Sequence, residues 1–384
     1  MERTRILLLT PRIGGGGAQQ VMALLARGLP QERFEVHLGL VRAGDPGAGA
    51  VPAWVTAHGL GAERTRAAAL PLLRLVWRLR PDVILSGAPE ISFLVLFLRS
   101  FFPSRTRVLV RQNGTVSAAL AHGGVPRYTR LLYRLLYRRA DRVICQSRAM
   151  AEDLARETGI PCEQIAVLPN PVDLEGILAA RGAPSAWSGD GPHLLAAGRL
   201  APEKGFDLLI EALVKVRKRF PGADLTIAGS GREKAALQVQ SREANLGSSF
   251  RIAECIDTPY AFFPGAALFV LSSRYEGMPN ALLEAAAAGL PLVATPASGG
   301  VVDLLREQKG AWLAAHVSSD ALADAIVLAL ESFGPGARFR HRFFPSTGDF
   351  DSQKISHSRA QASPDTNYRS ALKKSTTNQQ LINK

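Results

Sequence analysis

The stretch ALFVLSSRYEGMPNALLEAAAAGLPLVATP occupies residues 267–296 and decides the fold class. Its first seven residues form a short apolar run typical of a buried strand, and PLVATP at 291–296 is a second such run. Between them, residues 280–289 have the length and composition of a helix, which Pro279 helps to start. A strand, a helix and a second strand in this order predict a parallel βαβ unit.

The same alternation continues along most of the chain. It predicts two Rossmann-like, doubly wound α/β domains that face a central cleft, with ligands bound beyond the carboxyl ends of the strands. The Gly-, Pro- and Ser-rich segment 181–192 is the predicted linker between a first domain at 1–180 and a second at 193–335. Further strands are expected at 5–10, 34–41, 82–87, 107–113, 141–147, 193–200 and 223–230, and further helices at 21–29, 71–80 and 206–220.

The character of the sequence changes near residue 336. The segment 336–384 has no apolar period and is rich in Ser, Asn, Gln, Thr and Lys. Such a composition buries too little apolar surface to order a chain. We therefore expect residues 336–384 to form a disordered or atypical tail.

Two glutamates lie in the loop and the helix of the stretch 267–296. Glu276 follows the strand, and Glu284 lies a little over one turn into the helix. Gly277 permits close backbone approach, and the helix start at Pro279 and Asn280 offers N–H groups to phosphate. A carboxylate for a sugar, N–H groups for phosphate and a carboxylate for ribose hydroxyls together predict a sugar-nucleotide site. The alternative is a pair of surface glutamates beside a capped helix.

Two cations follow another predicted strand. The segment AAGRLAPEKGFDLLIEAL at 196–213 ends its strand at Gly198 and places Arg199 and Lys204 before the next helix. Two positive charges at the mouth of a cleft suit a diphosphate, and they would stabilise a nucleoside-diphosphate leaving group. Loop cations are usually solvated surface charges, and it is the pair of glutamates that makes a phosphate site the better interpretation.

Four contiguous glycines, Gly14 to Gly17, join the first strand to the first helix. They permit a tight turn and a close approach to phosphate or substrate, which makes Gly15 and Gly16 candidate ligand contacts. Their spacing does not match the G-x-G-x-x-G pattern of dinucleotide sites. A purely structural turn is the alternative.

These elements, in this order, resemble the retaining family-4 glycosyltransferases of the GT-B fold. The resemblance covers roughly residues 5–335. It rests on GGGGAQ (14–19), RADRVICQS (139–147), LPNPVD (168–173), AGRLAPEKGFDLLIEA (197–212) and YEGMPNALLEA (275–285). The glycine loop of the family usually continues to Glu, whereas this chain has Gln19 there.

The resemblance implies a role for each matching residue. Arg199 and Lys204 would bind the donor diphosphate, Glu276 would contact the donor sugar, and these three form the predicted catalytic set; Glu284 would bind the ribose. The family needs no metal or other cofactor, retains anomeric configuration, and is thought to use the donor phosphate to assist the acceptor hydroxyl. The full predicted donor site is Gly15, Gly16, Arg199, Lys204, Glu276, Gly277, Met278, Pro279, Asn280 and Glu284.

The amino-terminal half is strongly basic. The chain has a net charge of +13, and residues 1–180 hold 23 Arg, no Lys and 14 acidic residues. A polyanionic partner is therefore expected, unless the arginines reflect compositional bias alone. Segment 127–142 is a basic amphipathic helix and 91–107 is apolar with basic residues, a pattern typical of membrane-surface elements. The alternative for both is ordinary core leucines with a solvated arginine face.

The acceptor is expected on the first domain. Segments 111–118, 131–143 and LPNPVD resemble family members that extend lipid-linked oligosaccharides with N-acetylhexosamines. This implies a polyprenyl-diphosphate-linked or other glycan acceptor. Arg111 and Asn113, after a strand end, are the acceptor-side candidates; His122 is a third, unless it is an ordinary surface-loop histidine.

The expected function is retaining transfer of a hexose or N-acetylhexosamine from a UDP-linked donor to a lipid-linked or polysaccharide acceptor. The alternatives are a GT-B epimerase or phosphorylase, or a basic membrane- or nucleic-acid-binding protein without catalysis. The chain lacks helix-turn-helix, zinc-finger and RNP motifs, so no nucleic-acid partner is expected. Cys145, Cys162 and Cys255 suit neither a disulfide framework nor a zinc site. With no signal peptide or membrane span visible, we expect a cytoplasmic protein on the inner face of the cell membrane.

Overall fold

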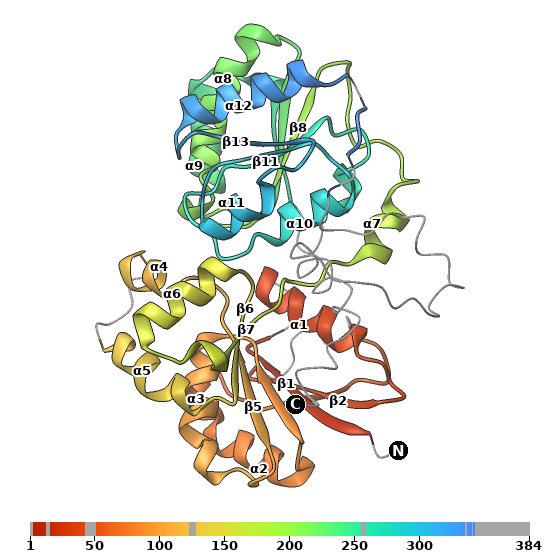
Figure 1. Cartoon of the computed structure of the whole chain (residues 1–384). Helices are drawn as coiled ribbons and strands as arrows, with labels where there is room; N and C mark the ends of the chain where they lie inside the picture. Colours follow the sequence, from red (N-terminus) through yellow and green to blue (C-terminus); the bar gives the residue numbers. More distant parts are fainter. Residues whose placement is uncertain are drawn as a thin grey trace, which may run out of the picture. The chain divides into compact units, whose positions relative to one another are not determined.

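The computed structural model describes residues 3–12, 16–42, 51–122, 128–254, 259–334, 336–339 and 341, apart from the side chain of His122. The chain divides into two compact units, and the division falls between Pro171 and Val172. Each unit contains one parallel sheet covered by helices (Figure 1). The predicted fold class of two doubly wound Rossmann-like domains is confirmed.

The first unit is built on a seven-stranded sheet in the order β3-β2-β1-β4-β5-β6-β7, and all neighbours are parallel. The interior strand β1, TRILLLT, is apolar on both faces because helices cover both faces of the sheet. The strands are β1 (Thr4–Thr10), β2 (Phe34–Leu40), β3 (Thr56–Gly59), β4 (Val83–Ser86), β5 (Arg107–Arg111), β6 (Arg142–Cys145) and β7 (Ile165–Val167).

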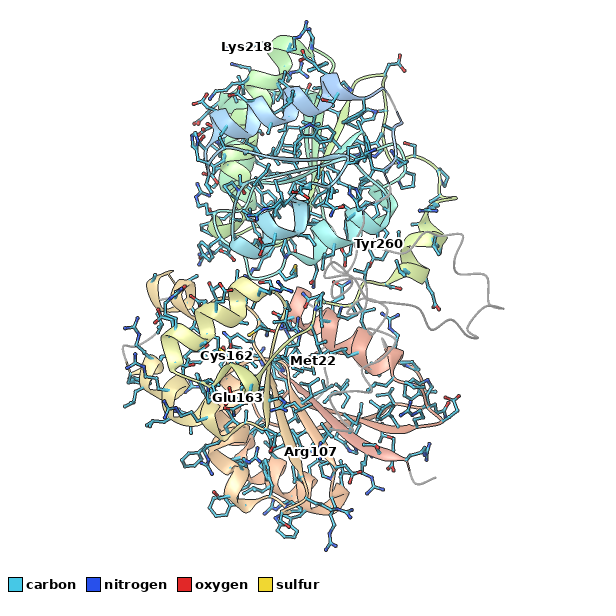
Figure 2. All side chains as sticks on the ribbon, viewed as in Figure 1. Met22, Arg107, Cys162, Glu163, Lys218 and Tyr260 are labelled. Carbon is cyan, nitrogen blue, oxygen red and sulfur yellow. The ribbon has the colours of Figure 1, made fainter. Side chains whose placement is uncertain are left out.

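Helices lie on both faces of this first sheet. On one face α1 packs through Met22, which shares a core with Ile6 and Leu8 of β1 (Figure 2). On the other face, α2, α3 and α5 enclose a second core that includes Leu7 and Leu9. The helices are α1 (Gly17–Gly28), α2 (Ala69–Leu79), α3 (Pro89–Leu98), α4 (Val116–His122), α5 (Thr129–Leu136) and α6 (Arg148–Thr158).

The second unit has a six-stranded parallel sheet in the order β10-β9-β8-β11-β12-β13. The chain makes β8, β9 and β10 in succession and then returns to place β11 beside β8. The loops that follow β8 and β11 therefore lie at the same sheet edge as neighbours. The strands are β8 (His193–Ala197), β9 (Asp224–Ala228), β10 (Phe250–Ala253), β11 (Leu268–Leu271), β12 (Leu292–Ala294) and β13 (Ala311–Leu313).

The helices of the second unit bury apolar stripes against this sheet. In α8 the buried positions recur at helical spacing, while Arg217, Lys218 and Arg219 in its last turn complement the helix dipole. The apolar stripe consists of Phe206, Leu209, Ile210, Leu213 and Val216. The helices are α7 (Leu174–Ala180), α8 (Phe206–Arg219), α9 (Lys234–Glu243), α10 (Asn280–Ala287), α11 (Gly299–Leu305) and α12 (Ser319–Ser332).

The change of unit comes earlier in the chain than the predicted linker at 181–192. Helix α7, which the sequence assigned to the first domain at 1–180, contacts α10 and the 3-10 turn η8 (Tyr260–Phe262). Its Ile177 belongs to the same core as Phe263. Residues 172–180 therefore belong with the second unit because α7 buries its apolar face there.

The first residues of the predicted tail pack against the second unit. Phe339 makes edge-on contacts with Trp312 and Phe333, and its backbone N–H donates to the carbonyl of Gly289. His341 is buried, and its Nε2 lies 2.8 Å from the carbonyl oxygen of Leu290. Residues 336–384 were expected to form a disordered or atypical tail, but Phe339 and His341 are packed in the second unit because the ring of Phe339 contacts other apolar rings there. Residues 342–384 lie outside the described residues.

The apolar run ISFLVLFL forms most of α3. Ile91, Val95 and Leu96 are fully buried in the first unit, whereas Phe97 points outward. The run is therefore mainly a core helix, apolar nearly all round because it is enclosed on most sides. None of the described helices is long and apolar enough to cross a membrane.

Candidate functional site

Two loops of the second unit meet beyond the ends of neighbouring strands. The loop after β8 carries Lys204, and the loop after β11 carries Glu276. Because β8 and β11 are adjacent, the two residues come together across 72 positions of sequence. Lys204 Nζ lies 2.5 Å from Glu276 Oε1. The structure thus joins two of the predicted site residues in one ion pair.

Glu276 is held through one of its two carboxylate oxygens. Oε1 accepts hydrogen bonds from Lys204 Nζ and, at 2.7 Å, from the hydroxyl of Ser273. The backbone N–H of Glu276 donates to the carbonyl of Ala297 at 3.2 Å. Within the described ranges, no group donates a hydrogen bond to Oε2. The carboxylate, only 10% exposed, is therefore oriented by the protein and retains an acceptor for a ligand hydroxyl.

The backbone around Lys204 depends on Gly205. Lys204 ends the 3-10 turn η6 (Pro202–Lys204), and Gly205 follows with a φ of +61°. The hydroxyl of Ser272 donates to the Lys204 carbonyl at 2.9 Å. A Cβ on Gly205 would lie 2.1 Å from the Ser272 carbonyl oxygen, far inside van der Waals contact. Only glycine fits this junction of the two loops.

We expect Gly205→Ala to lower the free energy of unfolding by about 2–4 kcal/mol, because left-handed strain and a backbone clash act together. Urea denaturation followed by circular dichroism measures the change. Gly182→Ala is the matched control in the same unit, since nothing lies within 4 Å of its added Cβ. Equal effects at the two positions would contradict the role assigned to Gly205.

A second ion pair clamps the loop from outside. Both guanidinium nitrogens Nη1 and Nη2 of Arg274 bind the carboxylate of Asp207, at 2.7 and 2.5 Å. Arg274 Nη1 also donates to the carbonyl of Pro202 at 2.8 Å. Burial alone would raise the pKa of Asp207, but the bonds from Arg274 lower it below its usual value. The sequence did not predict this clamp, because Arg274 lies in the loop after β11 whereas Asp207 lies in the first turn of α8, 67 positions earlier.

Arg199 is placed less firmly than Lys204. Its side chain is 66% exposed, and Nη2 contacts Glu203 Oε1 at 2.7 Å. The backbone N–H of Arg274 in turn donates to the Glu203 carbonyl at 2.8 Å. Arg199 thus extends from the same loop as Lys204 but remains largely in solvent. An exposed guanidinium with a single carboxylate partner can reorient toward an anionic ligand at little cost.

Of the donor-site residues predicted at the start of α10, some can offer backbone groups to a ligand and others are buried in the core. Met278 is buried in the apolar core of the second unit, so its side chain is a packing residue. Pro279 is also buried, and Asn280 is half-buried as the first residue of α10. No side chain caps this helix start. The Gly277 carbonyl, 3.5 Å from the hydroxyl of Ser298, completes the turn into the helix.

Glu284 is a buried carboxyl group on α10. It is 4% exposed, and Tyr260 donates a hydrogen bond to its Oε1 at 3.4 Å. Burial raises the pKa of Glu284 to about 7, and the neighbouring carboxylate of Asp173 adds to this rise. A carboxyl group that changes charge near neutral pH is characteristic of a ligand site more than of a surface helix.

Asp173 and Tyr260 connect Glu284 to the segment LPNPVD. Asp173 caps α7 by accepting a bond from the N–H of Gly176 at 3.0 Å. A Cβ on Gly176 would lie 3.0 Å from the Tyr260 ring, so the cap and the ring are packed together. LPNPVD was one of the motifs of the family resemblance, but no role was predicted for its Asp173. No local pattern links Tyr260 to Glu284, because the contact depends on tertiary packing.

In the first unit, Arg111 and Asn113 form a polar cluster in which Arg111 is buried and Asn113 half-buried. Arg111 donates from Nη1 to Asn113 Oδ1 and from Nη2 to Asn170 Oδ1. Asn113 donates in turn to the Gly87 carbonyl at the end of β4. Burial lowers the pKa of Arg111 to about 10. The two acceptor-side candidates are thus brought together at the strand ends.

An apolar cavity of about 70 Å³ lies beside this cluster in the first unit. Arg111 is the charged residue among its walls. The apolar walls come from β1, β4, β5, β6, α1 and the segment after β7: Ile6, Leu8, Leu25, Leu29, Val83, Leu85, Leu109, Ile144, Leu168, Pro169 and Pro171. Ordinary ligand pockets have volumes of about 300–1,000 Å³. The cavity is therefore too small to hold a sugar by itself.

Other predicted site residues are only partly described. Gly15 lies outside the described residues, while Gly16 precedes α1 in an extended conformation. The Gly16 carbonyl accepts bonds from the N–H groups of Gln19 and Gln20. His122 is the last residue of α4, and its side chain lies outside the described part. The acceptor-side role of His122 therefore stays a prediction.

Two family models match the chain. The model described as Glycosyltransferase Family 4 matches residues 15–175. The model described as Glycosyl transferases group 1 matches residues 183–343. Together they span most of the two units.

The matched share of the relative's own length differs among three named relatives. Glycogen synthase of Mycobacterium tuberculosis is 30% identical over 290 residues, 73% of this chain and 68% of that protein. In Campylobacter jejuni, N-acetylgalactosamine-N,N'-diacetylbacillosaminyl-diphospho-undecaprenol 4-alpha-N-acetylgalactosaminyltransferase is 24% identical over 357 residues, 89% of this chain and 94% of that protein. The lipopolysaccharide core biosynthesis glycosyltransferase LpsE of Rhizobium meliloti is 29% identical over 231 residues, and the match spans only 60% of its length.

Solved structures share the fold. Anabaena HepE, crystallised with UDP and glucose, has a TM-score of 0.67 and 19% sequence identity. The match covers 86% of this chain and 90% of HepE. At this level of identity the likeness establishes the architecture of the two domains.

Proposed function

The chain belongs to the glycosyltransferases with family 4 and group 1 domains and has their GT-B fold, and from this premise we propose that it transfers a hexose or N-acetylhexosamine with retention of configuration. The proposed donor is UDP-linked, and the proposed acceptor is a lipid-linked or polysaccharide glycan. The observation that carries this proposal is the Lys204–Glu276 pair where β8 and β11 end side by side.

Lys204 and Arg199 would act on the departing diphosphate. In retaining transfer the bond between the anomeric carbon and the phosphate oxygen breaks, and the acceptor oxygen bonds to the same face of that carbon. The acceptor hydroxyl gives its proton to the departing phosphate oxygen. Negative charge grows on the diphosphate during this step, so fixed cations beside it lower the barrier. Lys204, oriented by two bonded loops, suits this role better than the exposed Arg199.

The carboxylates would hold the two ends of the donor. Glu276 has Oε2 available for a sugar hydroxyl, while Oε1 is engaged by Lys204 and Ser273. Glu284 lies on α10 and would accept hydrogen bonds from the ribose hydroxyls in its ionised form. Between them, the uncapped N-terminus of α10 presents backbone N–H groups to phosphate.

The acceptor would bind the first unit near Arg111 and Asn113. A buried guanidinium compensated by amide oxygens attracts an anionic group such as the phosphate of a lipid-linked glycan. The Campylobacter jejuni relative is named for an undecaprenol-linked acceptor, which supports this class. A lipid-linked acceptor would bring the enzyme to the membrane surface, which we propose as its place of action.

Metal independence is part of the proposal. Among the described residues, no three His, Cys, Asp or Glu side chains are grouped so that they could hold a metal ion. Cationic side chains would take the place of a metal at the diphosphate. Transfer that is unchanged by EDTA is the expected result.

A donor screen tests the proposal directly. The full chain is incubated with UDP-, GDP- and ADP-sugars, and both thermal unfolding and slow donor hydrolysis are measured. A true donor raises the melting temperature by linkage, whereas nucleotides that do not bind leave it unchanged. Protection by UDP-sugars is the expected outcome. If no nucleotide sugar protects the protein or is hydrolysed, the proposed function is wrong.

Donor binding should depend on pH through Glu284. Its pKa of about 7 in the free protein means that the carboxyl group is partly protonated at neutral pH. Ribose hydroxyls need the ionised form, so binding below pH 7 first requires loss of a proton. The affinity for UDP should therefore fall about tenfold between pH 8 and pH 6 through this group. Isothermal titration calorimetry in two buffers measures both the affinity and the proton release.

Glu284→Gln separates this effect from the ionisation of the nucleotide. The phosphate of UDP titrates in the same range, but it does so equally with both proteins. The variant should bind UDP more weakly at pH 8 and show a flatter pH dependence. Parallel curves for the two proteins would mean that Glu284 does not contact the ribose.

A further inference from the structure

We infer that the first unit docks on an anionic lipid bilayer through one surface of α2, α3 and α5. We call it the arginine–aromatic surface. The inference names the membrane partner of the proposed lipid-linked transfer and in that respect rests on the proposed function. The surface is defined by six outward apolar side chains, each more than half exposed: Leu70, Trp77, Phe97, Phe101, Leu131 and Leu135.

In the part of the first unit that the structure describes, exposed large apolar side chains lie in this region. Among its described residues, the large exposed apolar side chains are these six and Tyr128, just before α5. The same helices have well-filled inner faces: Phe93 and Tyr133 pack edge to face at 5.0 Å, and Tyr137 is fully buried. The outward residues therefore form a second apolar face, additional to the core.

Hydrogen bonds connect the segments that carry the six residues. Trp77 Nε1 donates to the carbonyl of Phe101 at 3.0 Å, which joins α2 to the end of α3. The guanidinium of Arg139, after α5, donates to the Phe97 carbonyl and to the hydroxyl of Ser100. These contacts link α2 to α3 and α3 to α5, which lie together on one side of the sheet (Figure 1).

Arginines alternate with the apolar side chains on the outward face. On α2, Arg74 lies one turn from both Leu70 and Trp77. Arg134 on α5 and Arg138 in the 3-10 turn η4 (Tyr137–Arg139) continue the face of Leu131 and Leu135. Each donates one hydrogen bond to a backbone carbonyl, Arg134 to that of Glu157 and Arg138 to that of Gly159. Within the described residues, Arg74, Arg134 and Arg138 form no salt bridge. Long arginine stems can lie along an apolar surface while the guanidinium reaches an anionic group at its edge.

This region also contains most of the excess positive charge of the chain. Residues 64–142 include 15 Arg, no Lys and three acidic residues, against a net charge of +13 for all 384 residues. One of the three acidic residues, Asp141, is paired with Arg99. The field over α2, α3 and α5 is therefore strongly positive and attracts an anionic partner.

An anionic bilayer matches both properties of the surface. Aromatic side chains partition into the headgroup region, and arginines around them bind lipid phosphates. A second copy of the chain would place two positive surfaces against each other, which disfavours a dimer through this face. A nucleic acid would match the charge but would leave the outward leucines and phenylalanines of the surface in water.

Vesicle binding by the full chain tests the inference. We expect co-sedimentation with phosphatidylcholine–phosphatidylglycerol vesicles, weakened by salt, and little binding to phosphatidylcholine alone. Trp77→Ser combined with Phe101→Ser should reduce binding at least about tenfold, since two anchoring rings are lost. Leu313→Ser combined with Leu328→Ser is the matched control, because both leucines are exposed on the second unit. The control should bind vesicles as the unaltered chain does.

Further measurements make the outcome decisive. Brominated lipids should quench the fluorescence of the unaltered chain, and Trp77→Phe should remove most of this quenching while vesicle binding persists. Retained thermal protection by UDP shows that each variant is folded, and it also tests the donor site independently of the bilayer. Binding that ignores lipid charge, normal binding by the Trp77–Phe101 variant, displacement of vesicles by duplex DNA or a dimer that this variant dissociates would each overturn the inference.

Discussion

Replacing Glu276 with glutamine is expected to reduce sugar transfer about 10²–10³-fold, the usual loss when one preorganised polar group is removed from a reacting centre. Glutamine keeps the size of the side chain but removes the charge that orients Lys204. The amide also changes the acceptor available to a sugar hydroxyl. The measurement is kcat and KM with the donor found in the screen, under conditions where the chemical step limits turnover.

The pattern of effects distinguishes a catalytic role from a structural one. In the proposed function Glu276 contacts the sugar, so thermal protection by UDP alone should survive in the variant while transfer is lost. Glu243→Gln is the matched control, because Glu243 is an exposed glutamate on α9 of the same unit. If the Glu276 variant transfers sugar normally, or if it loses UDP protection to the same extent as transfer, the role assigned to it is wrong.

The fold was predictable because its central strands are long apolar runs between glycine- or proline-containing loops. TRILLLT of β1 and the segment of β11 are each enclosed on two faces, and this leaves a clear signal in sequence. The edge strand β3, TAHG, has no apolar run, since three of its four residues are exposed. Strand β7 is three residues long and half-buried. Neither β3 nor β7 buries enough apolar surface for its sequence to predict a strand.

The sequence predicted which residues form the site, but it did not predict which of them contact one another. Lys204 and Glu276 could each be placed after a strand, but their pairing follows from β11 returning to the side of β8. The order of strands within a sheet is a property of the whole domain, and local patterns do not determine it. For the same reason the sequence did not predict that Tyr260 and Asp173 lie near Glu284, because they approach it only through the packing of α7 and η8 on α10.

The amphipathic segments show where residue patterns were ambiguous. The run ISFLVLFL was expected to be a membrane-surface element or core, and most of its residues are core. Its outward residue Phe97 joins Phe101 and Trp77, and Trp77 lies in a helix whose surface role the sequence did not suggest. That the outward residues of three neighbouring helices lie on one side of the sheet follows only from how the helices pack.

Lys204→Met should be as damaging as the change at Glu276, with a different signature. Lys204 is the better-held cation of the predicted diphosphate site, since Ser272 and Gly205 fix its backbone and Glu276 fixes its ammonium group. Loss of its charge removes stabilisation of the leaving group, and we expect transfer to fall about 10²–10³-fold. Thermal protection by UDP should fall as well, because the diphosphate is part of UDP.

The Lys204→Met and Glu276→Gln changes should not be additive. If the ion pair acts as one device, the double variant should transfer sugar about as slowly as the worse single variant. Arg199→Met provides the comparison: its side chain is 66% exposed and does not contact Glu276, so its effect should add to that of Glu276→Gln. Multiplying losses for the Lys204–Glu276 pair would show that the two residues act independently, and unchanged UDP protection in Lys204→Met would show that Lys204 does not contact the diphosphate. A non-additive loss of transfer with weakened UDP binding would place the ion pair at the diphosphate, as the geometry of β8 and β11 predicts.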